Sequence, residues 1–420
     1  MSSVRPCIVY QAPWDWDFLW NRAQPLAQAL TAHADVLYLD CGDRSIESGW
    51  RSWLWWLRET FRARPSRVWS LLLPVFRYSR CDLMAPGLWR YTWRRWNPLV
   101  LRTTRGDRES SVYRQLQQDL LHRRDRGQPL WLLTSRPPAE GLLDLVPWSR
   151  IAADLEDPWP EMPWYSTVPA AVYQRLMDRA NVVFANGAAI ARTARAHYGA
   201  NVFELPNGVA AEFVEACADP QPRPAWLPAR DSPERAAVFT GYINNRIDFT
   251  LLREIASLAI GWNFFFVGSV ALPPESRELW TEILATGRVV HVPAVAHSAL
   301  PAILQHADAL LLLYTPAAAA AMLPAKLLEY IAAARPILCN NRWLTEIYPA
   351  NTFHVCEDAR AVAGALDRIA AEPELPASTV AAARALAANH TWEKRAQLLF
   401  DTLMAGGCPP SDTPSALVDA

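Results

Sequence analysis

A lysine and a glutamate, Lys326 and Glu329, stand one helical turn apart in the second half of the chain. Apolar residues around them recur at helical spacing, which predicts a helix with Pro324 in its first turn and Pro336 just beyond its end. The apolar run 309–314 predicts a buried strand before it, so the helix should begin where parallel sheets bind anions. Lys326 adds positive charge there, and Glu329 can accept hydrogen bonds from two hydroxyls, such as those of a ribose. An ordinary amphipathic helix with solvated charges is the alternative.

Three carboxylates follow the predicted strand 151–155, at Asp154, Glu156 and Asp157. Acidic side chains at the carboxyl end of a strand lie where α/β sheets carry out chemistry. Neighbouring carboxylates raise one another's pKa, so Asp157 is the candidate general base, with Asp154 beside it as a second catalytic candidate. The alternative is a turn or helix-capping carboxylate before Pro158.

A glycine and an arginine open the next α/β segment. Gly241 lies near the end of the predicted strand 237–242 and allows backbone to come close to a phosphate. Arg246 follows in the loop before Asp248, which should cap the next helix. Arg246 can therefore meet the same anion as Lys326, and an exposed loop cation is the alternative.

The loop after the first predicted strand, 6–10, is rich in aromatic and acidic residues. Trp14 and Asp15 lie in this loop, and Arg22 lies in the helix that follows. Loops in this position face the ligand-binding edge of a parallel sheet, so these three are candidates for contact with a second substrate. The alternative is that the tryptophans of this loop, Trp14 and Trp16, cap the hydrophobic core.

Short apolar segments alternate with helical patterns along most of the chain, which predicts an α/β fold. The Pro-rich segment 219–233 is expected to be a surface excursion or linker. The main expected strands are 6–10, 35–40, 99–103, 130–135, 151–155, 182–186, 237–242, 263–268, 289–293, 309–314 and 352–357.

Residues 46–105 interrupt this alternation with tryptophan and arginine. Between positions 50 and 108 the chain carries thirteen arginines against three acidic residues, together with eight of its twenty tryptophans. Helical spacing of these residues predicts basic amphipathic helices that lie in a membrane interface. A Trp-rich core flap with a solvated basic face is the alternative. The interface candidates are Trp50, Trp53, Arg58, Arg62, Trp89, Trp93 and Arg94.

Composition narrows the class of protein. The chain is 51% hydrophobic with a net charge of −1, which gives no reason to expect a nucleic-acid partner. Its seven cysteines show neither metal-type spacing nor an even disulfide framework. Residues 1–10 do not have the pattern of a secretory signal, and no apolar run reaches the roughly 18 residues of a membrane span. A protein of the reducing cytoplasm is expected.

The stretch that holds Lys326 resembles the sugar-nucleotide signature of GT-B glycosyltransferases, in particular the group 1 (GT4-like) type. The matching residues are Pro324, Lys326, Leu327, Glu329, Tyr330, Ala333 and Pro336. The segment 205–209, LPNGV, is similar to that family's inter-domain crossover. The resemblance implies an α/β GT-B fold, in which two Rossmann-like doubly wound domains face each other across a cleft.

The implied domains are an acceptor-binding domain 1–207, in which 46–105 is the membrane-interface insertion, and a nucleotide-sugar-binding domain 208–388. A terminal helix 389–405 would cross back to the first domain, and a tail 406–420 would be disordered. The resemblance also implies a metal-independent transfer without a cofactor. The donor would be a UDP- or GDP-sugar held by Gly241, Arg246, Lys326, Leu327 and Glu329.

The implied partners are this donor, a lipid-linked or saccharide acceptor near Trp14, Asp15 and Arg22, and an anionic membrane surface. The protein would thus work peripherally on the inner face of the cell membrane, with Asp157 as the base in polysaccharide biosynthesis. Many retaining members carry a second glutamate eight positions before Glu329, where this chain has Ala321. Two alternatives follow, an inactive sugar-nucleotide-binding or scaffold protein and a sugar-nucleotide epimerase.

Overall fold

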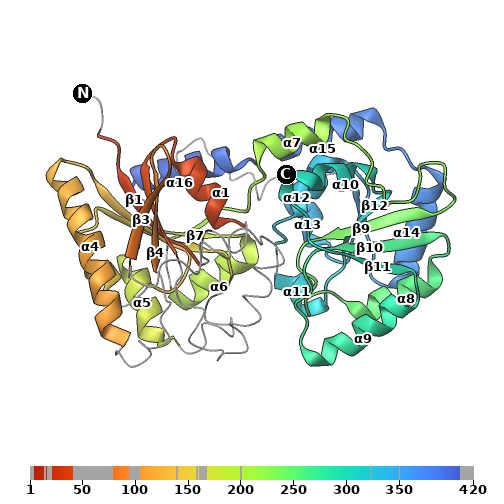
Figure 1. The fold of residues 1–420 in the computed structure, drawn as a ribbon, viewed down its shortest axis with the longest axis horizontal. Helices are drawn as coiled ribbons and strands as arrows, with labels where there is room; N and C mark the ends of the chain where they lie inside the picture. Colours follow the sequence, from red (N-terminus) through yellow and green to blue (C-terminus); the bar gives the residue numbers. More distant parts are fainter. Residues whose placement is uncertain are drawn as a thin grey trace. The chain divides into compact units, whose positions relative to one another are not determined.

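The computed structural model describes residues 4–13, 16, 21–40, 79–93, 105–138, 141–157, 159, 168–198, 201–321, 323–349 and 351–406. These residues form two compact units (Figure 1). Within the described ranges the first unit holds 4–206 and 395–406, and the second holds 207–394.

The first unit is built on an eight-stranded sheet with the order β3-β4-β2-β1-β5-β6-β7-β8. Neighbouring strands run parallel, except the antiparallel edge pair β3 and β4. The strands are β1 (Cys7–Gln11), β2 (Asp35–Leu39), β3 (Ser79–Ala85), β4 (Leu88–Trp93), β5 (Leu130–Thr134), β6 (Arg150–Leu155), β7 (Val182–Ala185) and β8 (Val202–Glu204).

Helices cover both faces of this sheet, as a parallel sheet requires (Figure 1). In the view of Figure 1, α1 (Ala23–Leu30) and α16 (Trp392–Met404) lie above the sheet. Below it lie α5 (Ala170–Arg179) and α6 (Ala188–Tyr198), while α4 (Arg105–Asp125) flanks it on the left. The strands β1 and β5 are buried along their whole length, which explains why continuous apolar runs identified them in the sequence.

The second unit has a parallel six-stranded sheet with the order β11-β10-β9-β12-β13-β14. Its strands are β9 (Arg235–Thr240), β10 (Trp262–Val267), β11 (Val289–Val292), β12 (Ala309–Leu312), β13 (Ile337–Cys339) and β14 (Phe353–Val355). Strand order reverses between β9 and β12, and the carboxyl ends of strands at such a switch point are where open α/β sheets bind ligands.

Helices of the second unit form two layers around its sheet. One layer includes α8 (Phe249–Leu258), α9 (Pro274–Ala285) and α14 (Ala359–Ala371). The other includes α7 (Ala211–Ala218), α10 (Leu300–His306), α12 (Leu327–Ala333) and α15 (Ala377–Ala388). The short helices α11 (Pro316–Ala321) and α13 (Trp343–Ile347) follow the carboxyl ends of β12 and β13.

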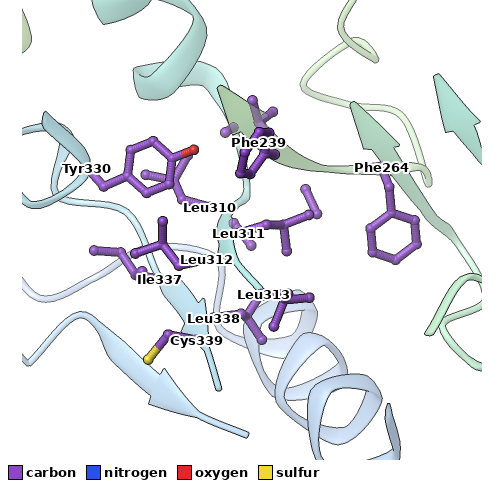
Figure 2. Packing of buried hydrophobic residues seen from close by; sticks show 14 of the residues in the cluster. Phe239, Phe264, Leu310, Leu311, Leu312, Leu313, Tyr330, Ile337, Leu338 and Cys339 are labelled. Carbon is purple, nitrogen blue, oxygen red and sulfur yellow. The ribbon is translucent and has the colours of Figure 1, made fainter. Parts of the chain in front are cut away.

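The packing of α12 on the sheet fixes the residues around it. Figure 2 shows Tyr330 beside the apolar side chains of β12 and β13. Tyr330 is fully buried, and its hydroxyl accepts a hydrogen bond of 2.8 Å from the backbone N–H of Thr240 at the end of β9. The helix that carries Glu329 is thereby tied to the end of the central strand.

Two local predictions need correction. The helix at 323–334 begins only at Leu327, because Pro324 closes a turn in which its carbonyl accepts from the Leu327 N–H at 3.0 Å. Residues 88–93 form strand β4, paired with β2, so Trp89 and Trp93 do not lie on a helix. The predicted strand 99–103 and nearly all of the tail 406–420 lie outside the described residues.

The segment at the start of the second unit is joined to the segment at its end. Val209 and Thr391 form a parallel bridge, and the Trp392 N–H donates to the Val209 carbonyl at 3.1 Å. A Cβ on Gly208 would lie 2.9 Å from the Trp392 ring, so glycine allows this close packing. Across the described ranges, no helix has both the length and the apolar character needed to cross a bilayer.

Candidate functional site

Two glycines follow the neighbouring strands β9 and β10 of the second unit, and β9 borders the switch point. Gly241 follows β9 with φ 112°, and Gly268 follows β10 with φ 151°. A Cβ on Gly268 would lie 1.9 Å from the Gly241 carbonyl oxygen, so only glycine permits this approach of the two strand ends. The result is a stretch of backbone without side chains at the carboxyl edge of the sheet.

Lys326 reaches this backbone from the turn before α12. Its Nζ lies 3.8 Å from the centre of the Phe239 ring, and a Cβ on Gly241 would be 2.9 Å from it. Burial lowers the pKa of Lys326 to about 7, against the opposing effect of the Glu329 carboxylate. In the part of the chain that the structure describes, no carboxylate lies within ion-pair distance of Nζ. A bound anion would supply the missing partner.

Glu329 lies one turn further along α12 and is 18% exposed. Its Oε1 is 2.7 Å from Nε2 of His297, which belongs to the 3-10 turn η6 (His297–Ala299) after β11. This hydrogen bond raises the pKa of His297 despite the opposing effect of burial. Sequence reasoning missed His297, because a single histidine in an irregular loop carries no spacing signal.

Arg246 lies at the same edge of the sheet, in the loop between β9 and α8. The backbone N–H of Arg246 donates a hydrogen bond to Asn244 Oδ1 at 3.0 Å, and its backbone carbonyl accepts one from the Thr315 N–H at 2.8 Å. The loop is therefore fastened to the end of β12. Asp248, two residues further on, caps α8 as predicted by accepting a hydrogen bond from the Leu251 N–H at 2.9 Å.

A shallow, open pocket of about 540 Å³ lies beside α11 in the second unit. Its lining includes Ala319 and Ala320, the residue Asn340 after β13, and Trp343 of α13. The indole N–H of Trp343 donates to the Ala319 carbonyl at 2.8 Å, which fixes the ring. Ala321, where the resembling family has a glutamate, is the last residue of α11.

Asp154 and Arg22 form a buried ion pair in the first unit. Arg22 is 1% exposed, Asp154 is 0% exposed, and the guanidinium donates to both carboxylate oxygens, at 2.6 Å and 2.9 Å. Ser135 Oγ lies 3.1 Å from Asp154 Oδ2 and 3.0 Å from the hydroxyl of Tyr10. A carboxylate held in this way cannot reach an acceptor hydroxyl, so the interpretation of Asp154 as catalytic gives way to a structural role. Arg22 likewise joins α1 to β6 and is not exposed to a substrate.

Asp157 lies two residues beyond β6 at the carboxyl edge of the first sheet and is half-buried. Trp14 and Asp15 lie outside the described residues. Trp16 is described. Its ring packs edge-on against Tyr38 with ring centroids 4.9 Å apart, and its backbone N–H donates a hydrogen bond to Asp40 Oδ1. For Trp16 the core-capping alternative is therefore confirmed.

The predicted interface residues are only partly described. Trp89 is half-buried and is covered by the Arg123 guanidinium, 4.6 Å from its ring centre. The next residue in β4, Arg90, pairs with Asp40 at 2.7 Å. The side chain of Trp93 is not described, and Trp50, Trp53, Arg58, Arg62 and Arg94 lie outside the described residues.

Comparison with known proteins matches most of the second unit, and a few residues after it, to a protein family. Residues 249–401 match the family model described as "Glycosyl transferase-like", and this range contains Lys326, Glu329 and His297. Several solved structures align over almost the whole chain. Sucrose-phosphate synthase from Thermosynechococcus elongatus is 15% identical, with a TM-score of 0.57 and 96% of each chain covered. The chain therefore has the GT-B fold, and residues 249–401 resemble glycosyltransferases in sequence.

Two further GT-B structures extend the comparison. Anabaena HepE, solved in complex with UDP, is 11% identical with a TM-score of 0.59, covering 95% of this chain and 99% of its own. The catalytic domain of starch synthase IV from Arabidopsis thaliana, bound to ADP and acarbose, is 11% identical with a TM-score of 0.60, covering 96% and 99%. None of the curated proteins matches the chain. At these identities the GT-B architecture is what the structures share.

Proposed function

We propose that this GT-B protein transfers a sugar from a nucleoside diphosphate sugar to an acceptor hydroxyl. One observation carries the proposal. Lys326 is held against the side-chain-free backbone of Gly241 without a carboxylate partner among the described residues, and Glu329 lies one turn away. A cation beside open backbone suits a diphosphate, and the carboxylate suits a ribose.

The proposed reaction breaks the bond between the anomeric carbon and a diphosphate oxygen, and it forms a bond to the acceptor oxygen. The nucleoside diphosphate leaves with the electron pair of the broken bond. Lys326 and Arg246 compensate its developing charge. Because burial lowers the pKa of Lys326 to about 7, an arriving diphosphate favours the protonated form of the amine.

Asp157 is proposed as the general base that takes the acceptor proton. Like Glu156 it lies beyond the end of β6, whereas Asp154 is committed to Arg22, and the family resemblance favours Asp157 of the two. A base must lie within hydrogen-bonding reach of the proton that it removes, and the carboxyl edge of the sheet provides such a place.

The acceptor is proposed to be a glycolipid or a polysaccharide precursor held at the inner membrane face. The Arg- and Trp-rich segment 50–108 supports this, although within the protein the side chain of Trp89 contacts Arg123 and that of Arg90 pairs with Asp40. Strand β3, at the edge of the first sheet, adds exposed apolar side chains, since Leu83 is 64% and Met84 is 41% exposed. Apolar and basic groups together favour attachment to an anionic surface.

Nucleotide titration followed by a transfer assay tests the proposal. UDP, GDP and ADP are titrated against the purified protein by calorimetry, and the matching radiolabelled sugar nucleotides are then incubated with extracted membrane lipids. Binding of a nucleoside diphosphate at micromolar concentration and a lipid-soluble labelled product are expected. Absence of binding by all three nucleotides would contradict the donor site.

A second candidate is favoured by Ala321, which stands where retaining relatives of this signature carry a glutamate. A protein that binds a sugar nucleotide without transferring its sugar fits that replacement. The assay pair separates the two candidates. Nucleotide binding with neither transfer nor donor hydrolysis in any lipid extract supports the binding protein.

A further inference from the structure

The loop after β11 brings a histidine to the carboxylate of the donor site. Nε2 of His297 lies 2.7 Å from Oε1 of Glu329, where the side chains are 40% and 18% exposed. A carboxylate only accepts hydrogen bonds, so Nε2 carries the proton and donates. This holds for the neutral imidazole as well as for the imidazolium.

His297 is itself held in place. Its ring packs against Phe213 of α7, with ring centroids 5.2 Å apart and planes inclined by 39°. Phe213 is 4% exposed, so the imidazole packs against a buried side chain. The Glu329 hydrogen bond raises the pKa of His297, because the carboxylate stabilises the imidazolium form. The histidine is therefore fixed between a buried ring and the acid.

We propose that His297 is a positioning residue that orients Glu329 for the ribose of the donor. The inference rests on the proposed function and names a residue that the sugar-nucleotide signature does not contain. A glutamate has three rotatable side-chain bonds, and fixing them before the ligand arrives removes an entropic cost from binding. His297 occupies Oε1 from one side and leaves Oε2 to accept from the ribose hydroxyls.

The distinguishing property is the preference for ribose over deoxyribose. If Glu329 is held in place, loss of the 2′-hydroxyl costs a charge-assisted hydrogen bond, which lowers affinity about tenfold. If Glu329 is free to turn, both ligands bind more weakly and differ less. A merely structural ion pair would change stability and leave this ratio unaltered.

The experiment titrates three ligand pairs, UDP and dUDP, GDP and dGDP, and ADP and dADP, against wild type and variants. We expect wild type to prefer the ribonucleotide about tenfold and His297→Ala to prefer it by about threefold or less. His297→Gln retains an N–H donor toward Glu329 and should restore most of the preference. The control His306→Ala removes another histidine of the same unit, one that contacts the Gln221 carbonyl at 2.8 Å, and should match wild type.

A further variant separates the loss of the hydrogen bond from a loss of folding. His297→Phe keeps an aromatic ring against Phe213 but cannot donate to Glu329, so it should lose the ribose preference as His297→Ala does. An unchanged ratio in a folded His297→Phe protein overturns the positioning role and leaves the donor site intact. If wild type binds no nucleotide of the three pairs, the proposed function fails, and this inference fails with it.

Discussion

Lys326 brings its ammonium group into contact with the Phe239 ring and with the backbone around Gly241. If this is where the diphosphate binds, Lys326→Ala should weaken nucleotide binding about ten- to hundredfold, because a charge-assisted hydrogen bond contributes roughly 1.5–3 kcal/mol. Calorimetric titration measures the loss. Lys394→Ala, in which the lysine on α16 is removed, is the matched control and should bind as wild type does. Equal affinity in all three proteins would contradict the assignment of Lys326.

The same lysine predicts how donor affinity depends on pH. Burial lowers the pKa of Lys326 to about 7, so the free protein loses this charge as the pH rises through 7. A bound diphosphate raises that pKa, so binding takes up a proton above pH 7. Affinity should then fall by up to about tenfold for each pH unit above 7 and level off below it.

Titrations at several pH values in wild type and in Lys326→Ala test this linkage. The ligand's own protonation occurs in both proteins and cancels in the ratio of their affinities. A ratio that stays constant between pH 6 and pH 9 would show that Lys326 does not change its charge on binding.

Asp157 and Asp154 lie three residues apart and should respond differently to the same substitution. Asp157→Asn removes the proposed base, so the transfer rate should fall on the order of 10²- to 10⁴-fold with nucleotide affinity unchanged. Radiolabel transfer and calorimetry measure the two effects. A rate near that of wild type would mean that another group takes the proton.

Asp154→Asn supplies the contrast, because it breaks a buried ion pair and leaves Arg22 without its counter-charge. Breaking such a pair costs about 3–5 kcal/mol, so a lower midpoint of urea unfolding is expected for this variant and not for Asp157→Asn. Equal unfolding midpoints for the two variants would contradict the structural role of Asp154.

At the scale of elements, the close approach of the ends of β9 and β10 depends on glycine. Gly268→Ala places a Cβ 1.9 Å from the Gly241 carbonyl oxygen, so the strand ends must separate. We expect a marked loss of thermal stability together with weaker nucleotide binding. Gly364→Ala, within α14, is the control, since its nearest neighbour would be 3.7 Å away and alanine favours a helix by roughly 0.5–1 kcal/mol. Stability of Gly268→Ala equal to that of the control would contradict the close approach.

Sequence patterns identified most strands that are buried on both faces. The strands β1, β5, β9, β10 and β12 all lie within a residue or two of their predicted ranges, because continuous apolar runs leave few alternatives. Strand β4, which lies between β3 and β2, was missed. Its Trp89, Tyr91 and Trp93 alternate with polar residues, while Trp89 and Trp93 also fit a helical spacing, and pairing with β2 decided between the two periods.

The candidate site was likewise predictable only in part. Lys326, Glu329 and Gly241 could be placed at one edge of the sheet from the sequence, because they follow the predicted central strands in a recognisable motif. His297 and the ion pair of Arg22 with Asp154 depend on contacts across 32 and 132 residues. No local spacing records such contacts, so the sequence alone does not distinguish Asp154 from an acid of the site.

At the scale of the whole molecule, the distribution of Arg and Trp predicts behaviour on membranes. The protein should sediment with anionic liposomes at low salt, and raising the salt concentration should release most of it, since each basic residue near such a surface contributes about 1 kcal/mol. A variant with Arg51, Arg58 and Arg62 changed to Glu should stay in solution. Neutral liposomes are the control, and failure of wild type to sediment at low salt would contradict the membrane proposal.

The bridge between Val209 and Thr391 joins the two ends of the second unit, whose described residues run from 207 to 394. The first unit continues after this segment with 395–406, which includes most of α16. The second unit is therefore an insertion in the chain of the first unit, and the segments where it begins and ends are bridged to each other. A chimera that exchanges the second unit between relatives needs two junctions, one on each side of that bridge, because a single split near residue 207 would remove most of α16 from the first unit.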